Sequence, residues 1–147
     1  MKKINENYFM QEAIKEAKKA YNNNEIPIGA IIVINNKIIA KSHNQVEKLR
    51  DPTAHAEILA LTSAFNYLDN KYLKSCTMYV NLEPCIMCLG ALYWSKINFL
   101  IFSIKNKKNK NFKLNKHQLY PRMIIKSGIL KYESLKLLKD FFKKKRN

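Results

Sequence analysis

The spacing of hydrophobic residues changes along the chain from a helical to a strand-like pattern. Over residues 6–20 the apolar positions recur at helical spacing, which predicts an amphipathic first helix. Two apolar, β-rich stretches flank Asn35-Asn36, which predicts a hairpin over residues 28–41. The elements predicted next are a helix from Pro52-Thr53 to about Tyr67, a strand over 76–80, a helix that starts near Pro84, and a strand over 97–102.

The last third of the chain begins with a polar segment. Residues 103–120 are lysine-rich and have no period, so a long loop is expected there. A short strand over 122–126 and an amphipathic helix after Gly128 complete the pattern. Because strands alternate with helices after an initial hairpin, we expect an α/β fold with a mixed sheet covered by helices on both faces. With 147 residues, 47% of them hydrophobic, the chain is long enough for a core of its own, and residues 1–147 are predicted to form one domain.

Composition predicts a protein of a reducing compartment with an acidic partner. There is no run of about eighteen apolar residues and no apolar stretch near Met1, so neither a membrane span nor a signal peptide is expected. The three cysteines do not suggest a disulfide framework, and the expected location is the cytoplasm. The formal net charge is +16, for which an AT-rich genome is an alternative explanation. However, no Asp or Glu occurs between Glu83 and Glu133, which favours one anion-facing surface.

One histidine and two cysteines form a candidate metal site. Cys85 and Cys88 are three residues apart at the start of a predicted helix, so both thiols are expected on one face. Together with His55 they give two thiolates and one imidazole, whose total charge balances Zn²⁺. Three protein ligands leave one position for water, as in catalytic zinc sites. Cys76 is an alternative fourth ligand, although its place in a strand is typical of a small buried residue.

Glu57, two residues after His55, is the candidate proton carrier. In a regular helix these two side chains face nearly opposite directions, so they can converge only at the helix mouth, where the first residue departs from helical geometry. The alternative is an acidic surface residue that complements the helix dipole.

The combination His-x-Glu and Pro-Cys-x-x-Cys resembles the signature of the zinc-dependent cytidine and adenosine deaminases. The segments 25–30, 51–58, 82–85 and 140–142, with the basic residues that follow, are similar to those of bacterial tRNA-specific adenosine deaminases over nearly the whole chain. This resemblance implies a cytidine deaminase-like three-layer α/β/α sandwich with a five-stranded mixed sheet, a homodimer and one zinc ion per subunit. It also implies a tRNA substrate, in which zinc-activated hydrolytic deamination converts the wobble adenosine of the anticodon stem-loop, in particular that of tRNA-Arg, to inosine.

The resemblance also implies which residues bind the substrate. Asn44 would contact the base or its sugar, although a turn residue at the end of the hairpin is the alternative. Ile28 and the backbone of Gly29 and Ala30 would line the base pocket, where a small glycine permits close approach. The remaining expected RNA contacts are Asn106, Lys108, Phe142, Lys143, Lys145 and Arg146. The chain departs from the family in the loop after the fourth strand, which lacks glycine and carries Asn106 where an aspartate is expected.

Two other functions are compatible with parts of the pattern. A deaminase of free bases or nucleosides, such as guanine or cytosine, would share the zinc site without needing the acid-free half of the chain. A non-catalytic, zinc-stabilised nucleic-acid-binding module would need a fourth protein ligand and no role for Glu57. The apolar residues around much of the third helix, over 89–94, favour the homodimer, with burial in a large core as the alternative.

Overall fold

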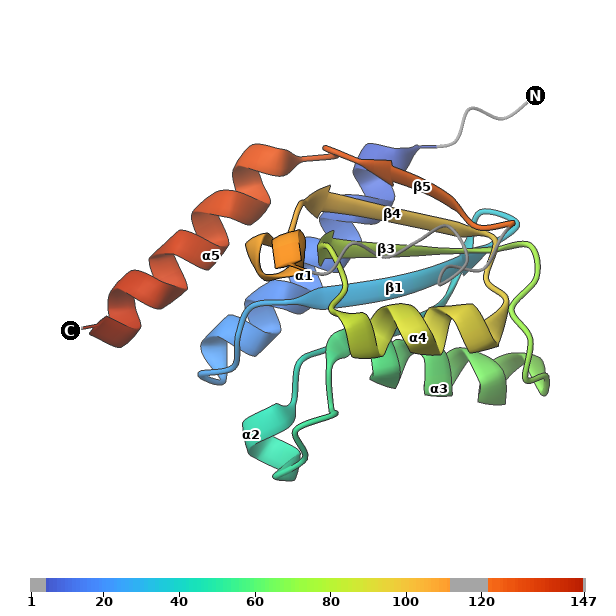
Figure 1. Ribbon diagram of the computed structural model, residues 1–147, viewed down its shortest axis with the longest axis horizontal. Helices are drawn as coiled ribbons and strands as arrows, with labels where there is room; N and C mark the ends of the chain where they lie inside the picture. Colours follow the sequence, from blue (N-terminus) through green and yellow to red (C-terminus); the bar gives the residue numbers. More distant parts are fainter. Residues whose placement is uncertain (1–4, 112–121, 147) are drawn as a thin grey trace.

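Five strands form one mixed sheet in the order β2-β1-β3-β4-β5 (Figure 1). The computed structural model describes residues 5–111 and 122–146. The strands are β1 (Gly29–Ile34), β2 (Lys37–His43), β3 (Cys76–Leu82), β4 (Phe99–Ile104) and β5 (Ile124–Ser127). The helices are α1 (Glu6–Asn22), α2 (Val46–Leu49), α3 (Ala56–Leu68), α4 (Ile86–Ser95), the 3₁₀ turn η1 (Lys107–Asn111) and α5 (Lys131–Arg146).

The start of β1 and the ends of β2 and β3 lie together, at the same end of the strands. Strand β1 is antiparallel to both β2 and β3, whereas β3, β4 and β5 are parallel. Gly29 pairs with His43, and Ala30 pairs with Val80. The start of β1 therefore lies beside the ends of β2 and β3, and the chain leaves these two ends toward α3 and α4.

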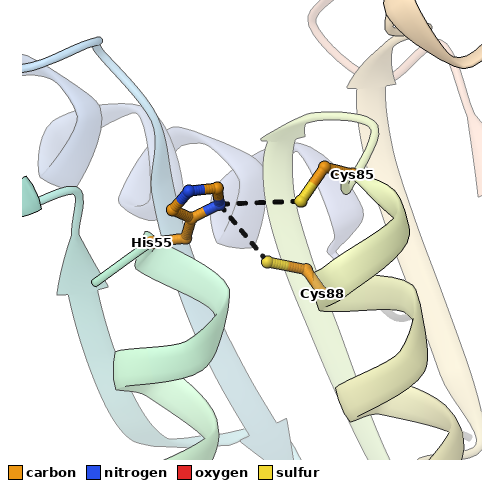
Figure 2. A group of neighbouring side chains, drawn as sticks. All are labelled: His55, Cys85 and Cys88. Carbon is orange, nitrogen blue, oxygen red and sulfur yellow. Dashed lines mark hydrogen bonds between the residues drawn. The ribbon is translucent and has the colours of Figure 1, made fainter. Parts of the chain in front are cut away.

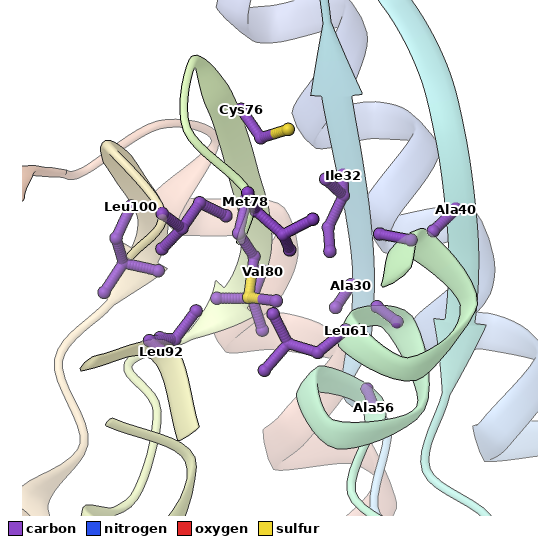
Figure 3. Close-up of a cluster of buried hydrophobic side chains, with 14 of the residues drawn as sticks. Ala30, Ile32, Ala40, Ala56, Leu61, Cys76, Met78, Val80, Leu92 and Leu100 are labelled. Carbon is purple, nitrogen blue, oxygen red and sulfur yellow. The ribbon is translucent and has the colours of Figure 1, made fainter. Parts of the chain in front are cut away.

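Helices cover both faces of the sheet. On one face, α3 and α4 pack over a core that includes Ala60, Leu61, Met78 and Leu92 (Figure 3). On the other face lie α1 and α5 (Figure 1), and the core there includes Tyr79 with residues of β1 and β4. The expected three-layer α/β/α fold with a five-stranded mixed sheet is confirmed. None of the helices in the described residues has the length and apolar character needed to cross a membrane.

Several predicted element boundaries are wrong by a few residues. Helix α3 begins at Ala56 and not at Pro52-Thr53, because the Asp51 side chain accepts hydrogen bonds from the Thr53 amide and hydroxyl, at 2.8 and 2.7 Å, and forms a turn instead. Strand β4 extends to Ile104 because its ladder with β3 continues to the pair Leu82 and Ile104. Strand β5 is shifted to Ile124–Ser127. The short α2 and η1 were not predicted, and residues 112–120 of the predicted long loop lie outside the described residues.

Candidate active site

The N-termini of α3 and α4 carry the three candidate metal ligands. His55 is the N-cap of α3 and Cys85 is the N-cap of α4, each with an extended backbone, and neither side chain caps its own helix. Cys88 lies in the first turn of α4. The helix predicted to start near Pro84 therefore begins at Ile86, and Pro84 precedes it. The extended backbone at the two caps directs both side chains away from their helices and toward one another (Figure 2).

The distances between the ligand atoms fit a single zinc ion. Nδ1 of His55 is 3.6 Å from Sγ of Cys85 and 3.6 Å from Sγ of Cys88. All three atoms lie within 4.8 Å of one another. Tetrahedral zinc with ordinary Zn–N and Zn–S bonds sets the nitrogen and sulfur atoms about 3.6 Å apart. Cys76 is not part of this group, because it is buried in the core at the start of β3. Within the described residues the group therefore has three protein ligands, which leaves the fourth position of a tetrahedral zinc ion for water.

The two thiols differ in acidity when no metal is bound. The pKa of the Cys85 thiol is lowered to about 5, chiefly because Cys88 donates a hydrogen bond to it. The pKa of the Cys88 thiol is raised far above its usual range by the same hydrogen bond and by burial. Because zinc binds cysteines as thiolates, its binding at this pair must release the proton of Cys88.

Glu57 is buried beside the ligands. The residue is only 3% exposed, and Oε1 has no hydrogen-bond partner among the described residues. Burial raises the pKa of this carboxyl to about 7, with smaller effects from the neighbouring Cys85 and His55. Convergence with His55 is possible because His55 precedes the first helical residue. A buried carboxyl oxygen without a partner, next to a ligand triad, fits a zinc site in which a water molecule is the missing partner.

Asn44 fastens the start of α3. Its side chain is buried, and Oδ1 accepts a hydrogen bond of 2.8 Å from the backbone N–H of Ala56, which lies between His55 and Glu57. Its own backbone N–H donates to the carbonyl of Ile28 at 3.1 Å. Asn44 is therefore more than a turn residue, because it connects the end of the hairpin to the helix that carries the site.

The three residues expected in the base pocket lie at or directly before the start of β1, and the structure shows a packing role for Gly29 that the sequence did not indicate. A Cβ atom at Gly29 would lie 2.1 Å from the carbonyl oxygen of Ala13, in α1. The close approach that Gly29 permits is therefore that of α1, on the face of the sheet away from α3. Ala30 is buried against the α3 and α4 face, and Ile28 is partly buried against the same core.

The side chain of Asn106 contacts the backbone of its own loop and of Glu83. Its Oδ1 accepts a hydrogen bond of 3.1 Å from the Lys108 N–H, and its Nδ2 lies 3.5 Å from the carbonyl oxygen of Glu83. The backbone N–H of Asn106 donates to the Glu83 carboxylate at 2.9 Å, and Asn109 donates to the carbonyl of Pro84 at 3.0 Å. The loop is thus fixed to the residues directly before the first cysteine ligand, and the Lys108 side chain is exposed.

The other expected RNA contacts lie at the C-terminal end of α5. Phe142 is 44% exposed, and the side chains of Lys143, Lys145 and Arg146 are exposed as well. This end of α5 lies beside the end of α1, where the rings of Phe141 and Tyr21 are 5.8 Å apart.

Sequence reasoning missed the roles of two buried polar residues. The carboxylate of Glu25 accepts hydrogen bonds from the backbone N–H groups of Glu47 and Lys48, at 3.0 and 2.9 Å, and so holds α2 in place. Asn81 is fully buried in β3, one residue beyond the predicted end of that strand. A polar residue that continues an apolar strand was the available signal for Asn81, whereas Glu25 was noted only as part of a motif.

A three-ligand metal site with a buried carboxyl, placed at the edge of a helix-covered mixed sheet, defines a zinc hydrolase. Residues 3–104 match the cytidine and deoxycytidylate deaminase zinc-binding region, a segment that contains all three ligands and Glu57. The chain therefore belongs to this family of zinc-dependent deaminases, and the prediction of zinc as the cofactor is confirmed.

Relatives within the family include enzymes that act on tRNA. The chain is 47% identical to a tRNA-specific adenosine deaminase of Aquifex aeolicus, over 95% of each chain. A structure from a study of A-to-I editing by tRNA:A34 deaminases at the wobble position of transfer RNA superposes with a TM-score of 0.77 at 32% identity, covering 89% of this chain and 99% of that one. A guanine deaminase of Bacillus subtilis has a TM-score of 0.68 at 34% identity, covering 78% of this chain and 73% of that one.

Proposed function

We propose that this protein is a tRNA adenosine deaminase that converts adenosine to inosine at wobble position 34 of the anticodon. The observation that carries the proposal is the His55, Cys85 and Cys88 triad beside the buried carboxyl of Glu57, whose Oε1 has no partner among the described residues. The chain also aligns almost end to end with a tRNA-specific adenosine deaminase. The guanine deaminase alternative has less support because that alignment covers less of both chains.

Glu57 is the proposed proton carrier. A zinc ion held by the triad supplies a Lewis acid that lowers the pKa of water to about 7. Glu57 would accept a proton from that water and deliver it to the purine ring nitrogen as C6 is attacked. It would then take the proton of the new C6 hydroxyl and pass it to the amino group, which leaves as ammonia while the C6 carbonyl forms. A carboxyl whose pKa is raised to about 7 is suited to both accepting and donating a proton near neutral pH.

The base enters beside the start of β1. Ile28 and the backbone of Gly29 and Ala30 line the pocket from the β1 side. Asn44 uses Oδ1 to hold α3, so its Nδ2 group is the part that we assign to the base or its sugar. A base in an anticodon loop is cheaper to flip into such a pocket than a base in a duplex.

The exposed cations around η1 and at the end of α5 are the proposed contacts to the RNA backbone. Lys108, Lys143, Lys145 and Arg146 are all exposed. Phe142 is 44% exposed at the C-terminal end of α5, and we assign it to packing against an unpaired base or sugar. Asn106 stabilises the η1 loop by accepting a hydrogen bond from the Lys108 N–H, and this loop is the part that contacts the RNA. We further propose tRNA-Arg as the substrate and the cytoplasm as the location.

A homodimer through α3 and α4 is the proposed assembly. The side chains of Trp94 and Tyr67 are 76% and 52% exposed, and that of Ile86 is 48% exposed. A groove of about 490 Å³ lies between these helices, with residues such as Phe65 and Ala91 in its walls. Exposed aromatic side chains beside an apolar groove favour a protein partner. Trp94→Glu should therefore give monomers in sedimentation velocity at concentrations where the parent sediments as a dimer, and a parent that sediments only as a monomer would contradict the assembly.

The deaminase proposal is tested by incubating the zinc-loaded protein with total tRNA and sequencing the tRNA for A-to-I changes. We expect changes confined to position 34 of tRNA-Arg. Parallel incubation with guanine, cytosine and their nucleosides tests the free-base alternative. Release of ammonia from guanine, without inosine in tRNA, would replace the proposed function. A cobalt-substituted sample whose spectrum indicates four protein ligands would favour the non-catalytic module instead.

A further inference from the structure

The carboxamide of Asn81 lies where the ladder between β1 and β3 ends. This is the end of the two strands that is close to the site. The last paired residues on this side are Ala30 and Val80. One residue further, Oδ1 of Asn81 accepts a hydrogen bond of 2.8 Å from the N–H of Gly29, and Nδ2 donates one of 2.9 Å to the carbonyl of Pro27. The side-chain amide therefore takes the place of a peptide group of the partner strand.

Both hydrogen bonds of Asn81 are required by its burial. The residue is 0% exposed, so water cannot replace either protein partner. The orientation of the amide is fixed as well. Reversing it would bring the oxygen against the Pro27 carbonyl and the NH₂ group against the Gly29 N–H. Residues 27–29 are consequently held in one position relative to β3.

Two further hydrogen bonds lead from residues 27–29 to the helix that carries the site. The carbonyl of Ile28 accepts a hydrogen bond of 3.1 Å from the Asn44 N–H, and Oδ1 of Asn44 accepts one of 2.8 Å from the Ala56 N–H. Ala56 is the first residue of α3, between the zinc ligand and the proposed proton carrier. A displacement of residues 27–29 is therefore passed through Asn44 to the start of α3.

We infer that Asn81 is a positioning residue for the active site, an inference that rests on the proposed function for its catalytic consequence. Through Pro27 and Gly29 it fixes the apolar wall of the base pocket. Through Asn44 it fixes the position of the α3 N-terminus relative to that wall. Asn81 touches neither the ligand atoms nor the substrate, and it acts only through the residues that it holds.

Backbone hydrogen exchange tests the chain of contacts without any substrate. In the zinc-loaded protein, Asn81→Ala should speed exchange of the Gly29 amide by about tenfold or more, because it removes the acceptor of that amide. Exchange of the Ala56 amide should also accelerate. The matched control is Val33→Ala, which removes buried methyl groups near the opposite end of β1 and leaves the contacts of Asn81 intact. Rates are compared relative to the Ile32 amide, so that a global loss of stability cancels.

Deamination kinetics then test the consequence. Asn81→Ala should lower kcat/KM on tRNA by about tenfold or more relative to Val33→Ala at equal zinc content. Asn81→Asp keeps the acceptor for Gly29 but sets a buried carboxylate oxygen against the Pro27 carbonyl, so its loss should be at least as large. Unchanged exchange at Ala56 in Asn81→Ala overturns the inference, as does a kcat/KM within twofold of that of Val33→Ala. If the parent protein does not deaminate tRNA, the proposed function fails, and the exchange at Ala56 alone decides the inference.

Discussion

Replacing Gly29 by alanine should separate α1 from β1 at a measurable cost in stability. A Cβ atom at this position would lie 2.1 Å from the Ala13 carbonyl oxygen and 2.4 Å from the Ala17 nitrogen, whereas ordinary contact begins at 3.4 Å. Both neighbours are helix backbone atoms that cannot rotate aside, so α1 or β1 must move by roughly 1 Å. Alanine restricts the unfolded chain and so recovers about 0.4–1 kcal/mol. We expect the free energy of unfolding to fall by about 2–3 kcal/mol.

Urea denaturation of the zinc-saturated protein measures this cost, and Gly90→Ala is the matched control. At Gly90, inside α4, an added Cβ atom would meet nothing within 4 Å. Alanine is also a better helix former than glycine, so this control should gain up to about 1 kcal/mol. If the free energy of unfolding of Gly29→Ala is within about 0.5 kcal/mol of that of the parent, the glycine is not required by the approach of α1.

Three further outcomes test the site. Cys88→Ala should bind less than a tenth as much zinc as the parent and unfold at a lower temperature. Stoichiometric zinc in elemental analysis of the Cys85 and Cys88 double variant would show that these cysteines are not the ligands. Glu57→Gln should retain zinc and tRNA binding but lose about 10²–10⁴-fold in kcat, and activity within tenfold of the parent would place the proton carrier elsewhere. Lys145→Ala should weaken tRNA binding and reduce the slope of log Kd against log salt concentration by about 0.7–0.9, whereas an unchanged slope would separate this lysine from the phosphates. The exposed Lys18 of α1 provides the control substitution for that titration.

The types and order of the main elements were predictable because the apolar spacing is clear in each. Element boundaries were less predictable where side chains compete with the backbone. At Asp51 the carboxylate forms a turn with Thr53, which delays the start of α3 and makes His55 an N-cap. The sequence pattern treated Pro52 as the helix start, since a proline after a polar residue is typical of that position.

The metal ligands were predictable from residue type and spacing, but the contacts that hold them in place were not. Cys85 and Cys88 stand three residues apart in the sequence, and their chemistry identifies them. Asn81 and Gly29 act on residues that are distant in the sequence. Asn81, for example, bonds to Pro27 across 54 positions, and nothing in local composition indicates such a partner. The close approach of α1 to Gly29 was not predictable for the same reason, because which face of β1 meets α1 is decided by the packed fold.

Two of the ligands are helix N-caps, so the geometry of the metal site does not depend on the residues further along each helix. His55 and Cys85 precede the first helical residue, so their directions depend on the local backbone and not on the rotation of the residues that follow. Side chains further along α3 and α4, such as Tyr67 and Trp94, can therefore change during evolution without redirecting those two ligands. The outer surfaces of these helices are free to diversify toward new partners while the chemistry at their N-termini is preserved.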